Sequence, residues 1–158
     1  MISKVIKIIL IIFWMGLIFS FSSDTGSVST KKSDGLIINV IESIYNRELS
    51  SEEKEMWTSY LIRPVRKGAH LVVYLILGIL ILSFVNEFMI LDYRALLLSL
   101  FVSFLYACSD EIHQLMVPGR SGQLSDVVLD TVGSGIGILL FTFIMRKWKK
   151  YEQKERVS

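Results

Sequence analysis

The chain has little of several residue types, and each shortage excludes something. It contains one cysteine, Cys108, so no disulfide can form within the chain, and we interpret this residue as a small apolar filler. The net charge is +2 with no dense basic stripe, so we expect no nucleic-acid partner. Proline occurs twice. We expect Pro64 to end a helix and Pro118, with Gly119, to form a tight turn.

Long runs almost free of charge take up much of the 158 residues. A helix needs about 20 apolar residues to cross a bilayer, and these runs reach that length when a few flanking residues are added. The runs are Ile8–Phe21, Leu71–Val85, Ala95–Cys108 and Val127–Met145. The sequence therefore predicts an all-α integral membrane protein, a single domain over 1–158. Its four-helix transmembrane bundle has spans at about 5–23, 67–85, 94–111 and 126–145.

The polar segment 24–66 separates the first two spans. Apolar residues at helical spacing after Ser33 and Asp34 predict one short amphipathic helix that begins there. Ser50 and Glu53 have the spacing of a capping box, which predicts a second short helix ending at Pro64. We expect both helices to lie on the bilayer surface or over the mouth of the bundle.

Polar or small residues follow one face of each of the last three spans. They recur every three or four residues, which places them on one side of a helix. The three stripes are Lys67, His70, Tyr74 and Gly78; Ser99, Ser103, Tyr106, Asp110 and His113; and Asp126, Asp130, Gly133 and Gly137. The last two glycines have the GxxxG spacing that allows helices to approach closely. We expect the three stripes to face one another.

The ionisable residues of these stripes predict a pocket at the membrane boundary, where charged side chains usually mark function. Its expected catalytic residues are His70, Asp110, Glu111, His113, Asp126 and Asp130, and its expected binding residues are Arg66, Lys67, Tyr74, Gln114 and Arg120. Because Glu111 and His113 cannot both share the helix face of Asp110, at least one of them should point toward the following loop.

Three interpretations of this pocket stay open. Carboxylates and histidine could perform acid–base chemistry beside a bound anion, since partial burial moves their pKa values toward neutrality. Carboxylate and histidine ligands could instead hold a divalent cation. The spacing matches no strong motif such as His-Glu-x-x-His, so we assign no metal ligand and leave the cofactor open. Finally, the residues could form ion pairs and hydrogen bonds that only fix the bundle.

The orientation follows from charges beside the spans. The last span is followed by the basic run Arg146-Lys147-Trp148-Lys149-Lys150, and the first carries Lys4 and Lys7 near its start. By the positive-inside rule both termini are cytoplasmic, although Arg66 and Lys67 oppose this orientation. We interpret the first run as an uncleaved span rather than an export signal. The pocket and segment 24–66 then face outward.

Five short motifs, in order along the chain, resemble the VanZ-like family of bacterial integral membrane proteins. They are Phe21-Ser22-Ser23; Arg66-Lys67-x-Ala69-His70-x-x-x-Tyr74-x-x-Leu77-Gly78; Ser109-Asp110-Glu111-x-His113-Gln114; Pro118-Gly119-Arg120; and Asp126-x-x-x-Asp130-x-x-Gly133. The resemblance implies a multi-pass protein of the bacterial cell membrane. The family is named for a protein that confers resistance to the glycopeptide teicoplanin, and the resemblance fixes no molecular activity.

We therefore expect the pocket to recognise an anionic envelope component such as a lipid-linked phosphate or cell-wall precursor. Whether it also modifies this component stays open. Arg66, Lys67 and Arg120 would clamp the anion, while His70, His113, Asp110 and Asp126 would transfer protons. The alternative is a non-enzymatic scaffold or partner-binding protein whose polar cluster locks the bundle. A third hypothesis is a small proton-coupled transporter, which requires the polar stripes to continue to the other end of the bundle.

Overall fold

The computed structural model describes residues 2–24, 26–120 and 122–157. In these ranges the chain forms five helices: α1 (Ile2–Ser23), α2 (Gly26–Tyr45), α3 (Ser51–Val85), α4 (Tyr93–Leu115) and α5 (Leu124–Val157). Among the described residues, all of these helices except α2 are long and apolar enough to cross a bilayer. The prediction of an all-helical membrane protein with four spans, and a further helix between the first two, is confirmed.

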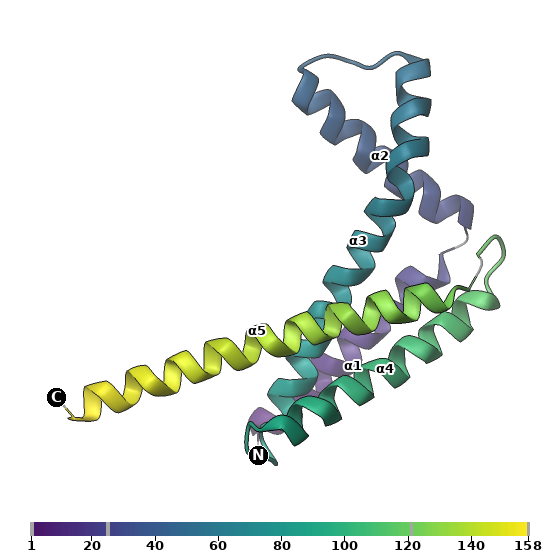
Figure 1. Ribbon diagram of the computed structural model, residues 1–158. Helices are drawn as coiled ribbons and strands as arrows, with labels where there is room; N and C mark the ends of the chain where they lie inside the picture. The colour runs from purple at the N-terminus through teal and green to yellow at the C-terminus, as the bar shows by residue number, and fades with distance from the viewer. Residues whose placement is uncertain (1, 25, 121, 158) are drawn as a thin grey trace.

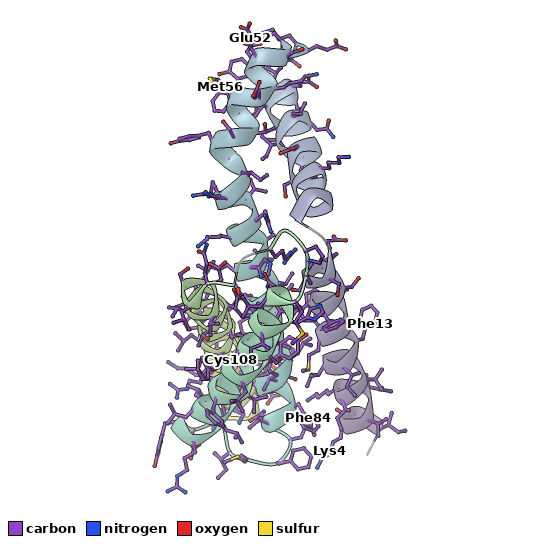
Figure 2. The ribbon with its side chains drawn as sticks, turned by 90° about the vertical axis from the view of Figure 1, so that its right-hand side faces the viewer. Lys4, Phe13, Glu52, Met56, Phe84 and Cys108 are labelled. Atoms are coloured by element: carbon purple, nitrogen blue, oxygen red, sulfur yellow. The ribbon has the colours of Figure 1, made fainter. Side chains whose placement is uncertain are left out.

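The four spans pack against one another along much of their length. Figure 1 shows α1, α4 and the first half of α5 beside the second half of α3, whereas the last part of α5 continues beyond the other helices. Large apolar side chains stay exposed on the outer faces, as at Ile12, Phe13 and Leu139. Figure 2 shows Phe13 pointing away from the bundle. Lipid tails cover such side chains in a membrane, where every backbone polar group is satisfied within the helices.

Helix α2 and the first half of α3 form an antiparallel pair that projects from one end of the four-span part (Figures 1 and 2). The predicted capping box is confirmed, because Ser50 Oγ accepts from Glu53 N at 3.3 Å and Ser50 N donates to a Glu53 carboxylate oxygen at 2.9 Å. Glu42 of α2 accepts from Leu49 N at 3.0 Å and pairs with Lys54 at 3.1 Å. These contacts fix the turn between the two helices.

Two predicted helix boundaries in this region are wrong. Helix α2 begins at Gly26 rather than near Ser33 or Asp34, because no proline precedes Ser33 in the helix to stop it extending upstream. Pro64 does not end a helix but lies inside the continuous α3. Its ring removes only the hydrogen bond to the carbonyl of Tyr60, an exposed residue, and the turns on either side keep theirs. The expected second short helix and the expected second span are therefore one long helix.

Helices α3 and α5 approach closely through glycines, as the stripes predict. A Cβ atom at Gly133 would lie 2.6 Å from the carbonyl oxygen of Leu71. A Cβ atom at Gly78 would overlap the backbone of Ser134, and one at Gly137 would overlap the carbonyl of Leu75. Only glycine leaves room for two backbones at these points, which is the packing that small residues provide in membrane helices.

An ion pair ties the start of α1 to the far end of α3. Lys7 Nζ donates to a carboxylate oxygen of Glu87, just after α3, and to the carbonyl of Ser83 at 3.0 Å. The hydrogen bond from Lys7 lowers the pKa of Glu87 below its ordinary value of 4.5. The pair therefore holds the end of the bundle that lies opposite to α2.

The first prediction concerns the contact between α3 and α5. Gly137→Ala should destabilise the protein by about 1–3 kcal/mol, since the new methyl group overlaps the Leu75 carbonyl. Gly135→Ala is the matched control, because its Cβ would make an ordinary 3.7 Å contact with Leu100 and alanine favours the helix. Thermal unfolding in detergent measures both. Equal melting temperatures for the two variants would contradict the close contact.

The second prediction uses the lowered pKa of Glu87. A carboxylate with a lowered pKa in the folded state stabilises the protein above its unfolded pKa, and this contribution is lost as the pH falls through the folded pKa. The difference in melting temperature between the wild type and Lys7→Met should therefore be larger at pH 7 than at about pH 3. The exposed Lys147→Met serves as control. A Lys7→Met difference that is the same at both pH values would refute the assignment.

Candidate functional site

A cavity of about 300 Å³ opens where α4 ends and α5 begins, with the middle of α3 as its other wall. The end of α4 and the start of α5 lie at the end of the four-span part from which α2 projects (Figure 1). The cavity brings together predicted site residues from three separate segments of the chain. They are Arg66, Lys67, His70, Gln114, Arg120, Asp126 and Asp130. Its volume is at the lower end of the range for small-molecule sites.

The cavity lining carries more positive than negative charge. Lys67 on α3 pairs with Asp126 in the first turn of α5, at 2.8 Å. The other basic groups in the lining belong to Arg63, Arg66 and Arg120, while the other acidic group is Asp130. Because the charges of Lys67 and Asp126 offset each other, the remaining charges of the lining are three guanidinium groups and one carboxylate. This excess suits an anionic ligand, since guanidinium groups bind phosphate and carboxylate with two parallel hydrogen bonds.

Arg120 is held in place by the backbone of α1. The preceding Gly119 has a φ of 76°, the left-handed conformation that glycine adopts readily, which confirms the predicted turn at Pro118-Gly119. Arg120 Nε donates to the carbonyl of Asp24 at 3.0 Å, and Nη2 donates to the carbonyl of Phe21 at 2.9 Å. Burial, and then the nearby Arg66 guanidinium, lower the pKa of Arg120 from its ordinary value of 12.5. Its Nη1 is buried without a hydrogen-bond partner among the described residues.

Three predicted residues meet beside the cavity, one from each of three helices, and two of them, His70 and Asp130, line it. Asp130 of α5 is 1% exposed, and its Oδ2 lies 3.5 Å from Nδ1 of the half-buried His70 on α3. Asp110 of α4 is 2% exposed. One nitrogen or oxygen atom from each of the three side chains lies within 4.8 Å of the others. The polar stripes of α3, α4 and α5 therefore do converge.

Helix α1 contributes to this cluster through Ser22, which is not among the predicted site residues. Ser22 Oγ donates to Asp110 Oδ2 at 2.9 Å, and Gln114 Nε2 donates to the same oxygen at 3.2 Å. Tyr74 is fully buried one turn after His70, close enough to interact with the charges of Asp110 and Asp130. Its hydroxyl has no hydrogen-bond partner among the described residues.

Of the six predicted catalytic residues, three do not line the cavity: Asp110, which belongs to the buried cluster, Glu111 and His113. The buried Glu111 accepts a hydrogen bond from the backbone N–H of Gln123, so it points toward the loop before α5, as predicted for one of the pair. His113 stacks on Phe19 with ring centroids 4.1 Å apart, and its Nε2 lies 3.0 Å from Ser23 Oγ. Both residues therefore attach α4 to its neighbours, and neither lines the cavity.

A second cavity of about 230 Å³ adjoins the first and is mainly apolar. Side chains of α1, α2 and α3 line it, among them Ile18, Leu36, Val65 and Val73. The two cavities share Arg66, His70 and Arg120. A charged and an apolar compartment thus meet at the same three side chains.

Sequence reasoning missed Ser22 and Arg63. Arg63 precedes Arg66 by three residues and Lys67 by four, so helical spacing alone places all three on one face once α3 is continuous through Pro64. Ser22 lies four residues after Ile18, and both are buried in the structure. The sequence gives no sign that this face of α1 meets Asp110 rather than lipid.

The fold and the cavity define a polytopic helical membrane protein with a charged cavity at one end of its bundle. A comparison with protein-family models identifies the family: residues 7–146 match the VanZ/LLP1 family. The chain belongs to this family, as its motifs predicted. No curated protein and no solved structure matches the chain.

The third prediction tests the contact between α1 and the buried cluster. Ser22→Ala removes a donor to the buried Asp110 carboxylate and should destabilise the protein by about 1–3 kcal/mol. Ser20→Ala, an exposed position on the same helix, should have a much smaller effect. Thermal unfolding of the two variants in detergent gives the comparison. A Ser22→Ala protein as stable as Ser20→Ala would show that α1 does not support Asp110.

Proposed function

We propose that this protein binds an anionic lipid of the bacterial cell envelope, with the phosphate of the lipid in the charged cavity and its chain in the apolar one. The observation that carries the proposal is that the two cavities adjoin and share Arg66, His70 and Arg120. A ligand that fills both needs a charged head and an apolar body. A lipid-linked phosphate or a lipid-linked cell-wall precursor has this chemistry.

The basic side chains of the charged cavity support binding of the phosphate. Arg63 and Arg66 lie on the same wall, one helical turn apart, and Arg120 approaches from the loop before α5. Phosphate oxygens accept charge-assisted hydrogen bonds from such groups. Lys67 takes part through its ion pair with Asp126, which a bound anion could rearrange. These four basic residues are the proposed binding residues, with Gln114 beside them.

The apolar cavity supports a lipid as the source of the phosphate. It lies between α1, α2 and α3, beside helices that expose apolar side chains to the bilayer. Burial of a hydrocarbon chain contributes about 0.8 kcal/mol per buried CH₂ group. A free inorganic phosphate would gain nothing from this compartment and should bind more weakly.

His70, Asp110, Asp126 and Asp130 are the proposed groups for any chemistry on the bound phosphate. Histidine and carboxylates can transfer protons at hydrogen-bond distance from a ligand, and His70 and Asp130 line the cavity. The scaffold alternative assigns these residues only to locking the helices. That role fits Glu111 and His113, which attach α4 to the loop and to α1.

The transporter hypothesis has less support. It requires polar groups free to bind protons along α4 toward the other end of the bundle. Ser99 and Ser103 instead donate their hydroxyl hydrogens to carbonyls of their own helix, those of Ala95 and Ser99. These bonds leave the hydroxyl groups committed to the helix.

We further propose that both termini are cytoplasmic and that the cavity opens on the outer side of the membrane. Basic residues follow the apolar part of the last span, from Arg146 to Lys150, and Lys4 and Lys7 lie near the start of the first span. An outward cavity would meet lipid-linked cell-wall intermediates of the outer leaflet. A contribution to teicoplanin resistance, the property that gave the family its name, would follow from binding such an intermediate.

The fourth prediction tests the anion. The double variant Arg63→Gln, Arg66→Gln should bind a long-chain prenyl phosphate at least about tenfold more weakly than the wild type, since it loses two charge-assisted contacts. Arg94→Gln, an exposed arginine at the other end of α4, should bind as the wild type does. Native mass spectrometry or thermal-shift titration in detergent measures the affinity.

Two comparison ligands complete this test. Inorganic phosphate and phosphatidylcholine should each bind more weakly than the prenyl phosphate, because one lacks the chain and the other lacks net negative charge. Equal binding of prenyl phosphate by the double variant and Arg94→Gln, or a preference for phosphatidylcholine, would refute the proposal.

A further inference from the structure

The cluster of His70, Asp110 and Asp130 brings together donor groups that bind metal ions in proteins. Each residue offers one ligand atom, a nitrogen from histidine or an oxygen from a carboxylate, and these atoms lie within 4.8 Å of one another. Zinc binds such groups at about 2.0–2.2 Å, so two ligands of a tetrahedral ion are about 3.4 Å apart. The separation of His70 Nδ1 and Asp130 Oδ2, 3.5 Å, agrees with this value.

The cluster itself holds two carboxylates and only one imidazole. Two carboxylates that are 2% and 1% exposed lie side by side, and the burial of unpaired charge is strongly unfavourable. His70 can offset one of them. Arg120 carries a further positive charge near Asp110, but two of its N–H donors bind the carbonyls of Asp24 and Phe21 rather than the carboxylate. A divalent cation would offset both carboxylates at once.

Unpartnered buried atoms beside the cluster give a second, independent observation. The Tyr74 hydroxyl is fully buried beside Asp110 and, among the described residues, forms no hydrogen bond of ordinary length and angle. Oδ1 of Asp110 and Oδ1 of Asp130 are also buried without a partner in the described part of the chain. Buried polar atoms are nearly always satisfied in native proteins, so several in one place point to a missing group.

We propose that His70, Asp110 and Asp130 bind a divalent metal ion, with Zn²⁺ or Mn²⁺ as the class that suits one imidazole and two carboxylates. Ser22 and Gln114 orient Asp110 by donating to its Oδ2, as outer hydrogen bonds commonly do for metal ligands. His70 and Asp130 line the charged cavity, so an ion that they hold would lie beside a ligand in it. The metal site does not depend on the proposed lipid, but coordination of a phosphate oxygen by the ion rests on the proposed function.

The experiment measures metal content directly. The protein is purified in detergent, stripped with a chelator, loaded with ZnCl₂ or MnCl₂ and desalted, and its metal is counted by elemental analysis. The wild type should retain one ion per chain. Asp130→Asn and His70→Gln should each bind it at least about tenfold more weakly, since each removes a ligand.

Asp126→Asn is the matched control. Asp126 lies one turn before Asp130 on the same helix and lines the same cavity, but it is not one of the three proposed ligands. It should retain the wild-type metal content. If Asp126→Asn loses as much metal as Asp130→Asn, the ion responds to the general charge of the cavity and the proposed site is wrong.

A readout on the wild type keeps the test valid if the ligand variants do not fold. Metal binding to the folded state raises stability, so ZnCl₂ or MnCl₂ should raise the melting temperature of the stripped protein. No retained metal and no shift with either ion would overturn the inference. Because no lipid is present, that result would leave the binding of prenyl phosphate untouched. Metal retention without prenyl phosphate binding would refute the proposed function alone.

Discussion

The close contact between α3 and α5 sets the rest of the site. Gly133 packs on the backbone of Leu71, and Gly137 packs one turn further along on Leu75. This register puts His70, the residue before Leu71, beside Asp130, which lies one turn before Gly133. A side chain in place of either glycine would separate the helices and so would separate the histidine from the carboxylate. The small residues that allow the approach therefore also determine which polar groups meet.

The other two spans complete the site from the opposite side. Asp110 of α4 comes next to the pair, and Ser22 of α1 fixes one of its oxygens. Arg120, in the loop between α4 and α5, is held by carbonyls at the end of α1. Each span thus contributes one part of a polar interior, while the outer faces stay apolar. Polar groups inside a membrane bundle face one another because the alternative is contact with hydrocarbon.

The proposed lipid and the proposed metal ion fit this arrangement in different layers. The buried carboxylates form the floor, where a cation would be stable, and the arginines form the wall and rim, where a phosphate would be stable. A site with opposite charges in two layers can hold an anion through both a metal ion and guanidinium groups. The adjoining apolar cavity gives the ligand its hydrocarbon part.

The sequence by itself determined the class of protein, its four spans, the capping box at Ser50, the turn at Gly119 and the faces that pack together. These follow from hydrophobic length, helical period and local hydrogen bonding, which act between residues near in the chain. The prediction that Pro64 ends a helix was wrong. Proline removes one backbone hydrogen bond, here the bond to the carbonyl of Tyr60, and Tyr60 is exposed. Tertiary structure alone decided which stripe residues meet. Glu111 contacts the loop before α5, His113 stacks on Phe19, and Ser22 binds Asp110. These contacts depend on how whole helices are rotated and shifted relative to one another, which local sequence patterns do not determine.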